Sequence, residues 1–550
     1  MGTESDKAVA EFMSMNLVTA KQSREADCRV SEELGIPSLI LMENAARAVV
    51  EVIWQHFEVE PDQKVVVICG HGNNGGDGLA VARHLKNHGV DVRAYVIAAS
   101  DSIGGDVLTN LVAARGAAVP IMHVTRAKDV GQLEADVRNC SVTVDALLGT
   151  GTRGEVHGLA ATVIPLINAG QGAVCAVDLP SGINADTGAV CGRVVRADAT
   201  VTLGTVKRGL VLFPGADFVG DLFWGDISAP IYALAEDRVV LCTDKLVNTC
   251  LPKRQADTHK GDYGRVLVVG GSKGMTGAAT LAGQAALRGG AGLTRVALPE
   301  SLNLEFEAGS LEVMSLPLPE TGAGTIGPQA LNVLGEQLDW ADVLAVGPGI
   351  SRHPETASFL HQLVSTSSKP LVLDADGITA FAGRMDVLEK RNGPMVITPH
   401  LGEMAELTGA KVEDLKTDLI ASAQAVAGSL NSVIVLKGTR TIIVAPDGET
   451  FVNLTGNPGM ASAGSGDVLT GLIAALIAQG NEPLAAAACG VFLHGLAGDL
   501  ASWEIGEAAL TAGDLLHHLP RAILHPDLWR PMSPRPLSPH VRFISRGRDK

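Results

Sequence analysis

The chain has 550 residues, a formal net charge of −17 and only 19% charged residues. These values exclude a coiled coil, a disordered chain and a general electrostatic attraction for nucleic acid. At about 150 residues per domain, the length allows three or four domains, or two large ones. The 63 glycines follow no G-X-Y period, which excludes a collagen-like chain and indicates local use of glycine in turns and close to ligands.

The eight cysteines form no C-x-x-C pair and no cluster at zinc spacing. Cys69, Cys175 and Cys489 lie in apolar runs, so we expect buried thiols and a reducing compartment. The first 20 residues lack the apolar core of a signal peptide, and the longest apolar run, 468–479, is shorter than the roughly 20 residues that span a bilayer. We therefore expect a cytoplasmic homo-oligomer without membrane or nucleic-acid partners.

The first half of the chain alternates strand-like and helix-like segments. Residues 64–69 form a continuous apolar run, typical of a buried parallel strand, and apolar or small residues at 78, 81, 82 and 85 have helical spacing. Further strands are expected at 90–97, 142–145 and 173–178. This order predicts a Rossmann-like, doubly wound α/β domain whose ligands bind beyond the carboxyl ends of the strands.

The same pattern restarts after a break between 236 and 257. We expect strands at 265–270, 343–346, 371–374, 395–398, 433–436 and 441–445, followed by an apolar helix at 468–478. The chain is therefore divided into α/β domains at 1–240 and 241–525. The segment 526–550 contains Pro and Arg without periodicity, and we expect it to be disordered.

The segment from Gly70 to Gly78 fits G-x-G-x-x-G at positions 70, 72 and 75, which alone is a weak dinucleotide signal. Asn73 and Asn74 add amides where a redox Rossmann loop needs only backbone. Asp77 is expected at the start of the helix, as a carboxylate in the position of a pyrophosphate or as a simple cap. The second strand does not end in a ribose-binding acid, which argues against hydride transfer.

Oxygen donors follow three neighbouring strands. Asn74, Asp145 and Ser181 each come after a predicted strand, and these strand ends converge on one crevice in a doubly wound sheet. Their side chains suit an alkali or alkaline-earth cation better than a soft metal. Taken singly, each residue is as readily explained by a cap or a turn.

Several motifs together resemble the NAD(P)H-hydrate epimerases, over about residues 10–240. They are Ser23-Arg24, 35–38, 41–46, the 72–78 glycine motif, 145–151 and Asp-Leu-Pro-Ser-Gly at 178–182. The resemblance implies that Asn74, Asp145 and Ser181 hold K⁺, and Asp178 is the candidate base. Lys207 is either an electrostatic contact or a solvated surface lysine. The implied contacts to the hydrated dinucleotide are Asn73, Asn74, Gly75, Gly76, Asp77, Gly149, Thr150, Gly151, Thr152, Arg153, Gly154, Glu155 and Asp178.

A second glycine-rich loop, 457–467, leads directly into the apolar helix. Small residues before a helix start leave backbone N–H groups open to an anion. Asp467 is not explained by phosphate binding alone, because two anions repel; it suits a base, or a partner of Mg²⁺-bound phosphate, better than a plain cap. The Gly-x-Gly-Asp pattern resembles the ribokinase-like superfamily, and this half has no Walker A motif.

Further motifs resemble the ADP/ATP-dependent NAD(P)H-hydrate dehydratases, over about residues 245–520. They lie at 259–264, 269–272, 347–350, 374–376, 398–403 and 437–441. Leu401 departs from the family's usual His-Pro-Gly-Glu, and His400 alone could be a structural hydrogen-bonder. The implied hydrate contacts are Ala282, Gly349, His400 and Asp467. The implied nucleotide contacts are Lys437, Gly438, Thr439, Arg440, Thr441 and Gly466.

The two resemblances imply a bifunctional enzyme that epimerises hydrated NAD(P)H and dehydrates the S form. ADP, or ATP, supplies a phosphoryl group that makes the C6 hydroxyl a good leaving group, with Mg²⁺ on the phosphates. One alternative is a ribokinase-like kinase for small molecules fused to a regulatory dinucleotide-binding domain. Another is a dinucleotide-binding scaffold without catalysis.

Overall fold

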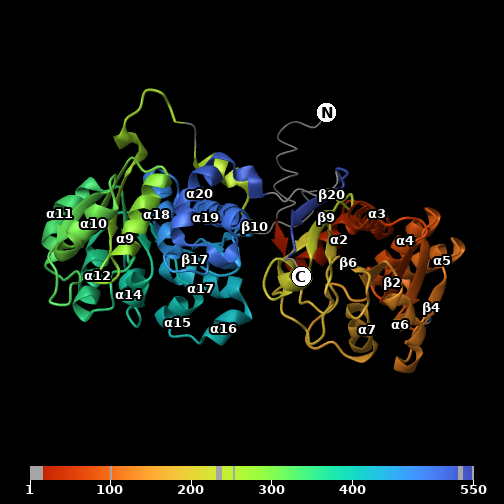
Figure 1. The fold of residues 1–550 in the computed structure, drawn as a ribbon. Coiled ribbons are helices and arrows are strands. Elements are labelled where there is room, and N and C mark those ends of the chain that lie inside the picture. The colour runs from red at the N-terminus through yellow and green to blue at the C-terminus, as the bar shows by residue number, and fades with distance from the viewer. Residues whose placement is uncertain (1–15, 100–101, 231–237, 252–253, 530–536, 548–550) are drawn as a thin grey trace. The chain divides into compact units, whose positions relative to one another are not determined.

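The computed structural model describes residues 16–99, 102–230, 238–251, 254–529 and 537–547 (Figure 1). The chain divides into two compact units. The first comprises Met1–Val239 with Arg530–Lys550, and the second comprises Val240–Trp529. The boundary falls within one residue of the one expected from sequence, apart from the C-terminal segment, which returns to the first unit.

The first unit contains an eight-stranded sheet in the order β20-β9-β7-β6-β5-β2-β3-β4. Its strands are β2 (Lys64–Cys69), β3 (Asp91–Val96), β4 (Ile121–His123), β5 (Val142–Ala146), β6 (Ala173–Val177), β7 (Ala199–Leu203), β9 (Asp221–Gly225) and β20 (Val541–Ser545). Chain order reverses between β2 and β5, which pair in parallel with Ile68 opposite Asp145. A separate pair joins β1 (Leu17–Val18) to β8 (Val206–Lys207).

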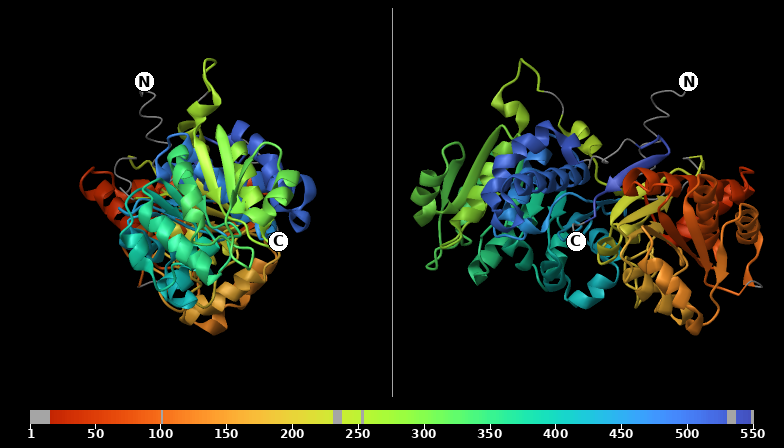
Figure 2. Two further views of the ribbon diagram at one scale, coloured as in Figure 1. Left: turned by 90° about the vertical axis from the view of Figure 1, so that its left-hand side faces the viewer. Right: turned by 45° about the vertical axis from the view of Figure 1, so that its right-hand side comes forward.

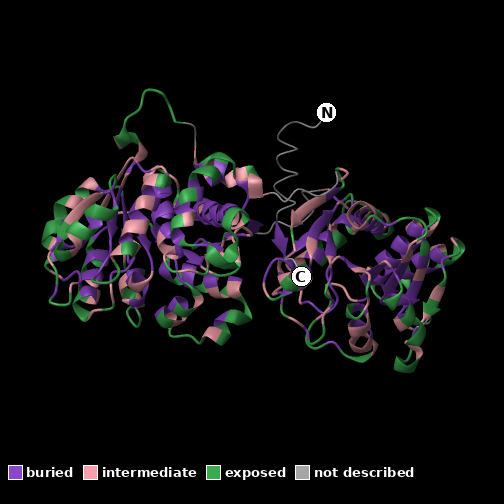
Figure 3. Cartoon of the chain, in the orientation of Figure 1, coloured by how far each residue is buried: buried purple, intermediate pink, exposed green. Residues whose placement is uncertain are grey.

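Helices cover both faces of this sheet. They are α2 (Ala20–Glu32), α3 (Ser38–Phe57), α4 (Asn73–Asn87), α5 (Gly105–Gly116), α6 (Gly131–Arg138) and α7 (Gly158–Asn168). Val65 and Val67 of β2 pack in one core with residues of α3, α4 and α5. Val66 and Ile68 pack in the other with residues of α6 and α7. Side chains of a strand alternate between its two faces, so a strand covered on both sides must be apolar throughout. Figure 3 shows that the strands of this sheet are largely buried.

The expectation of a disordered tail is wrong for the described part of this segment. Residues 526–529 form a short 3-10 turn, and β20 pairs antiparallel with β9. Val541 is buried, and the Phe543 ring packs edge-on against Phe223 at 5.0 Å. Ser538 donates to Glu51 of α3. Only Val541 and Phe543 show the alternating apolar pattern of a strand, and Pro and Arg residues surround them. This pattern was too short to predict β20 from the sequence.

The second unit contains a ten-stranded sheet in the order β10-β19-β18-β17-β16-β15-β14-β11-β12-β13. Its strands are β10 (Val239–Leu241), β11 (Arg265–Val269), β12 (Leu293–Pro299), β13 (Met314–Leu318), β14 (Val343–Val346), β15 (Leu371–Leu373), β16 (Met395–Ile397), β17 (Val433–Leu436), β18 (Ile442–Val444) and β19 (Thr450–Val452). The strands from β13 to β17 run parallel, whereas β17, β18 and β19 pair antiparallel. Chain order reverses between β11 and β14.

Small-residue helices pack on one face of this sheet. They are α9 (Thr276–Arg288), α18 (Ser465–Ala478), α19 (Pro483–Ile505) and α20 (Ala512–Leu524), and they share one core with the strands (Figure 2). By length and composition α19 could cross a membrane, but 83% of its most apolar window is buried. The remaining helices are α8 (Asp244–Cys250), α10 (Asn303–Gly309), α11 (Ala330–Trp340), α12 (Pro354–Thr366), α13 (Asp376–Thr379), α14 (Met385–Glu389), α15 (Leu401–Thr408), α16 (Val412–Thr417) and α17 (Leu419–Leu430). Cys69, Cys175 and Cys489 are buried free thiols, as predicted.

Candidate active sites

The first unit has a cavity of about 510 Å³ at the carboxyl ends of β2 and β5. Ligands bind at such a point of reversal in open α/β sheets. The structure therefore brings together the 70–78 glycine motif and the 145–155 segment, which are separate motifs in the sequence. The cavity is lined by His71, Gly72, Asn73, Asn74 and Gly75, and by Leu147, Leu148, Gly149, Thr150, Gly151, Thr152, Arg153, Gly154, Glu155, Val156, His157 and Ala160.

The glycine loop is shorter than expected, because α4 already begins at Asn73 with Gly72 as its N-cap. A Cβ on Gly75 would collide with the carbonyl oxygen of Gly70. Glycine at position 75 therefore allows the first turn of α4 to pack directly against the loop. Asp77 lies buried in the second turn and is not at the helix start, which corrects both interpretations made from sequence. Burial, and then the carboxylates of Asp178 and Asp27, raise the pKa of Asp77 well above its ordinary value.

Asn74, Asp145 and Ser181 are linked through the Leu148 peptide. Asn74 Nδ2 donates to Leu148 O at 2.9 Å, and Leu148 N donates to Ser181 Oγ at 2.8 Å. Ser181 Oγ donates to Asp145 Oδ1 at 2.7 Å. Asn74 Oδ1 is buried and has no hydrogen-bond partner, and burial raises the pKa of Asp145 to about 6. A buried amide oxygen without a partner, connected through Leu148 and Ser181 to a buried carboxylate, suits a bound cation.

Lys207 is a buried ion-pair partner of Asp178, so the surface interpretation of this lysine is wrong. Its side chain is 2% exposed, and its ammonium donates to Asp178 Oδ1 and, at 3.0 Å, to Leu203 O. Leu203 N also donates to Asp178 Oδ1. Asp178 itself has a φ of 68°, a left-handed conformation that costs about 1 kcal/mol or more. The backbone at the end of β6 is thus strained, and it directs the Asp178 carboxylate toward the buried ammonium of Lys207.

Asp27, which no sequence motif marks, is a further carboxylate close enough to Asp178, Lys207 and Asp77 to interact with their charges. Ser23 of α2 is bonded to Thr205 at 3.1 Å, which fixes α2 against the segment leading into β8. Asp27 lies one turn further on the same helix face. Asp27 is exposed to solvent on one side. Desolvation by the neighbouring protein atoms, and then the charge of Asp178, nevertheless raise its pKa to about 6, while Lys207 opposes the shift. Helical spacing from Ser23 was the only available signal.

The second unit has its candidate site at the carboxyl ends of β14, β15, β16 and β17, beside the point where chain order reverses. A Cβ on Gly347 would collide with the carbonyl oxygen of Asp374, and Gly349 has a φ of 60°. A Cβ on Gly349 would lie 3.0 Å from the Cβ of Ala278. Ala282, in contrast, is completely buried and packs against Gly471 of α18. Ala282 is therefore not open to a ligand in this structure, whereas Ala278, one turn earlier in α9, lies next to Gly349.

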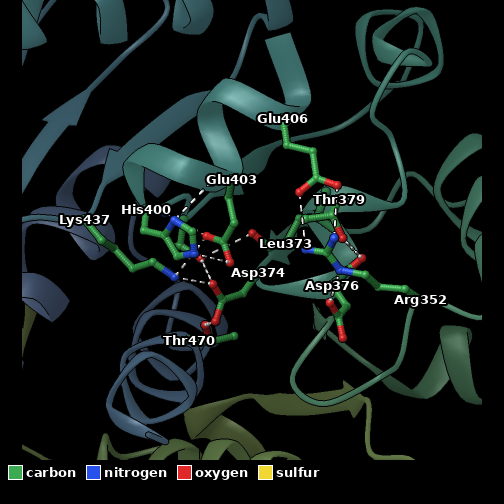
Figure 4. A network of polar contacts seen from close by, with 11 residues as sticks. Arg352, Leu373, Asp374, Asp376, Thr379, His400, Glu403, Glu406, Lys437 and Thr470 are labelled. Atoms are coloured by element: carbon green, nitrogen blue, oxygen red, sulfur yellow. Dashed lines mark hydrogen bonds and ion pairs between the residues drawn. The ribbon is translucent and has the colours of Figure 1, made fainter. Parts of the chain in front are cut away.

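Asp374 is the centre of a buried polar network at the end of β15 (Figure 4). Its Oδ1 accepts from Lys437 Nζ and Thr398 Oγ1, and its Oδ2 accepts from Thr470 Oγ1, each at 2.7 Å. Burial opposes ionisation, but these donors lower the pKa of Asp374. Lys437 Nζ also lies 3.6 Å from Glu403 Oε2, and these carboxylates raise its pKa despite burial. The ammonium therefore stays charged inside the site.

Asp467 lies in the first turn of α18, as predicted, three residues after the N-cap Gly464. Burial, and then the charge of Asp374, raise the pKa of Asp467 to about 7, while Lys437 opposes the shift. A Cβ on Gly466 would lie 3.5 Å from Lys437 Nζ. A carboxylate with this pKa, beside a lysine and a helix start, can accept a proton near neutral pH.

His400 has the structural hydrogen-bonding role considered from sequence, and its contact to the hydrate stays a prediction. It is the N-cap of α15: its Nδ1 accepts from Glu403 N at 3.0 Å, and Glu403 Oε2 accepts from His400 N at 2.7 Å. The side chain is nevertheless 59% exposed, so one edge of the ring is open to a ligand. Leu401 occupies the first position of the helix. Proline is favoured at this position but is not required there, and the capping box of His400 and Glu403 remains intact.

The remaining residues of the predicted nucleotide segment form the turn between β17 and β18. Gly438 and Thr439 are exposed. Arg440 donates to Leu454 O at 3.2 Å, toward the second glycine-rich loop. Lys437 differs from this group because its ammonium points inward to Asp374 (Figure 4).

Comparison with known proteins connects both sites to one family. Residues 38–209 match the family described as YjeF-related protein N-terminus, and residues 266–521 match NAD(P)H-hydrate dehydratase. The bifunctional NAD(P)H-hydrate repair enzyme Nnr of Moorella thermoacetica is 45% identical, over 92% of this chain and 96% of its own. This chain belongs to the family of bifunctional NAD(P)H-hydrate repair enzymes. The family member from Thermofilum pendens is 40% identical, over 92% and 96% of the two chains.

Solved structures similar to about half of the chain include one dehydratase. It is the ADP/ATP-dependent NAD(P)H-hydrate dehydratase of Bacillus subtilis, co-crystallised with ATP and Mg²⁺. It is 33% identical to this chain, with a TM-score of 0.46, and the match covers 52% of this chain and 98% of the Bacillus protein.

Proposed function

We propose that this enzyme repairs hydrated NADH and NADPH in two steps. The first unit interconverts the R and S epimers at C6 of the hydrated nicotinamide ring. The second unit dehydrates the S form at the expense of ADP or ATP. The observation that carries the proposal is the position of Asp467 in the first turn of α18, next to Gly466, where a Cβ would lie 3.5 Å from the ammonium of Lys437, which is itself held by Asp374. Family membership favours this function over a small-molecule kinase or a scaffold.

The dehydration balances as two bond exchanges. The C6 oxygen bonds to the terminal phosphorus of ADP as the bond from that phosphorus to AMP breaks, and Asp467 takes the hydroxyl proton. The C6–O bond then breaks and the oxygen leaves as inorganic phosphate, C5 loses a proton to this phosphate, and the C5–C6 double bond of the dihydronicotinamide returns. Lys437 and the N-terminus of α18 stabilise the negative charge on the phosphates. Gly349 and His400 are the proposed contacts to the hydrate.

Epimerisation requires the ring to open and close at C6. Asp178 takes the proton of the C6 hydroxyl as the C6–N1 bond breaks, and it returns this proton when the ring closes on the other face. Lys207, paired with Asp178, supplies the proton for N1 and recovers it on closure. The proposed substrate contacts are the cavity residues 73–75 and 149–155.

The donors in the first unit fit K⁺. Asn74, Asp145 and Ser181 supply oxygen atoms only, and the unpaired Asn74 Oδ1 supports a cation there. K⁺ would supply positive charge that holds the two cavity loops together. The donors in the second unit fit Mg²⁺ only when it arrives with the nucleotide. The described residues contain no group of three or more His, Cys, Asp or Glu side chains able to hold a metal, and Asp467 is the candidate carboxylate.

The K⁺ proposal predicts a cation-specific gain in stability. KCl should raise the melting temperature of the first unit more than choline chloride does. At a K⁺ concentration of 100 times its dissociation constant, binding stabilises the folded state by about 3 kcal/mol. Asn74→Ala should lose this response, because it removes the unpaired oxygen. Differential scanning calorimetry measures the effect, and equal shifts with both salts would contradict it. The rate of dehydration of the pure S hydrate should be the same in KCl and in choline chloride.

Lys437→Met should raise the KM for ADP about 10- to 100-fold, which corresponds to the loss of a charged hydrogen bond. Thr398 and Thr470 would still donate to Asp374. The variant nevertheless removes the counter-ion of a buried carboxylate, so its melting temperature is measured before the kinetics. Steady-state kinetics with varied ADP measures the change. Lys411→Met, at the exposed N-cap of α16, is the matched control and should behave as wild type. An unchanged KM in the Lys437 variant would remove this lysine from nucleotide binding.

The decisive test incubates the full-length enzyme with hydrated NADH and ADP or ATP, and follows recovery of absorbance at the reduced-nicotinamide band. Recovery of both epimers supports the proposal. Recovery of the S form alone would support dehydration without epimerisation. Absence of recovery with either nucleotide would refute dehydration, and phosphorylation of another small alcohol would then favour the kinase.

We further propose a homo-oligomer that acts in the cytoplasm, without nucleic-acid or membrane partners. The net charge of −17 and the free, mostly buried cysteines support a reducing compartment and a small-molecule substrate. Size-exclusion chromatography with light scattering tests the assembly.

A further inference from the structure

Helix α19 contacts the start of the glycine-rich loop through Asp499. Its Oδ2 accepts from Gly456 N at 2.9 Å, and its Oδ1 accepts from Asn457 Nδ2 at 3.1 Å. Asn457 Oδ1 in turn accepts from Gly459 N at 3.1 Å. The carboxylate therefore fixes the orientation of the Asn457 amide, and this amide fixes the turn that follows.

The same helix contacts the end of the loop through His494. Its Nε2 lies 2.9 Å from Ser465 O and 3.3 Å from Ser465 Oγ, and Ser465 is the first residue of α18. Burial lowers the pKa of His494 to about 4, so the imidazole is neutral at pH 7 and its Nε2–H can donate to the carbonyl. Ser465 immediately precedes Gly466 and Asp467, the residues assigned to nucleotide and hydrate.

Two glycines of α19 let the loop lie directly on the helix. A Cβ on Gly495 would collide with Thr455, and a Cβ on Gly498 would collide with the sulfur of Met460. Thr455 Oγ1 also donates to Phe492 O at 2.9 Å. The sequence His494-Gly-Leu-Ala-Gly-Asp499 thus presents a flat, small-residue surface with a polar anchor at each end.

We propose that Asp499 is a positioning residue for the nucleotide: through Gly456 and Asn457 it sets the shape of the loop that binds the phosphates. His494 holds the other end of the loop at Ser465. Neither side chain touches the substrate in this assignment; each acts through the loop. The inference rests on the proposed function, because it assumes that the 456–466 loop binds ADP or ATP.

The surroundings of Asp499 agree with an anchor that is ionised near neutral pH. Burial raises its pKa to about 6, while the hydrogen bonds from Gly456 and Asn457 oppose the shift. The charged groups near it are Arg440, which belongs to the predicted nucleotide segment, and Glu507. Each carboxylate oxygen faces an N–H donor, so an amide in its place must turn one NH₂ group toward a donor. Asp499→Asn is therefore nearly isosteric but mispaired.

The test measures ADP binding and kinetics of the full-length Asp499→Asn variant. We expect the KM and the dissociation constant for ADP to rise at least tenfold, with kcat for the S hydrate changed less than threefold. Epimerisation, which belongs to the other unit, should be unchanged. Glu504→Gln makes the same chemical change at an exposed position of α19 and should bind ADP as wild type does.

A double-mutant cycle with Asn457→Ala separates positioning from a general packing defect. If Asp499 acts through Asn457, the two substitutions together should weaken ADP binding little more than Asp499→Asn alone. Should Asp499→Asn fail to fold, Asn457→Ala alone must still raise the dissociation constant about three- to fivefold. Wild-type affinity for ADP in a folded Asp499→Asn variant would overturn the inference. Failure of the wild type to bind either nucleotide would instead overturn the proposed function.

Discussion

The Asp467→Asn variant should lose ADP-dependent dehydration by about 10²- to 10⁴-fold, the usual contribution of a general base. The amide keeps the shape of the helix start but cannot accept the hydroxyl proton. The wild-type kcat should rise as the pH passes through about 7, because the base acts only when it is deprotonated. This limb should be absent from the variant. Stopped-flow or steady-state assays with pure S hydrate across pH 5–9 measure both effects.

The same substitution should stabilise the second unit. The folded pKa of Asp467 lies above its ordinary value of 3.8, so ionising the carboxyl costs stability, and this cost grows between pH 4 and 7 and is constant above pH 7. Asp467→Asn should therefore melt at a higher temperature than wild type at pH 8. The control is Asp414→Asn, an exposed acid in the first turn of α16. Full dehydratase activity in Asp467→Asn would remove this residue from the chemistry.

The buried strands and the sites at their ends were predictable from local sequence. A strand covered on both faces is an uninterrupted apolar run, so β2, β5 and β15 and the polar residues after them could be located directly. The helix start at Asn73 was missed because glycines at 75, 76 and 78 oppose helix formation in isolation. Here they are required, because larger side chains on Gly75 or Gly78 would collide with Gly70 or Ala146.

Contacts between distant segments were not predictable. The burial of Lys207 depends on the β1–β8 pair and on Asp178, and the position of Asp27 depends on the Ser23–Thr205 bond. Nothing in the local pattern around these residues distinguishes them from surface charges. The anchor at Asp499 was hidden in the same way, because it lies in a long apolar helix whose composition indicates only a core.

The second large effect is expected for Asp178→Asn, which should slow epimerisation by about 10²- to 10⁴-fold. The asparagine oxygen can still accept from Lys207 and Leu203, so the buried ammonium keeps a partner and the fold is retained. Asp178→Ala would leave this ammonium unpaired, at a cost of about 3–5 kcal/mol. Asparagine is therefore the more informative replacement, because loss of activity would not be confused with unfolding.

A mixture of R and S hydrates gives this prediction a clear readout within one enzyme. Wild type should restore the whole mixture to NADH when ADP is present. The Asp178→Asn variant should restore the S fraction at the normal rate and then stop, because dehydration belongs to the second unit. Asp129→Asn, in a surface pair with Arg126, is the matched control in the first unit. Complete recovery at the wild-type rate would show that proton transfer at C6 does not depend on Asp178, and Asp27 and Asp77 would become the carboxylates to replace next.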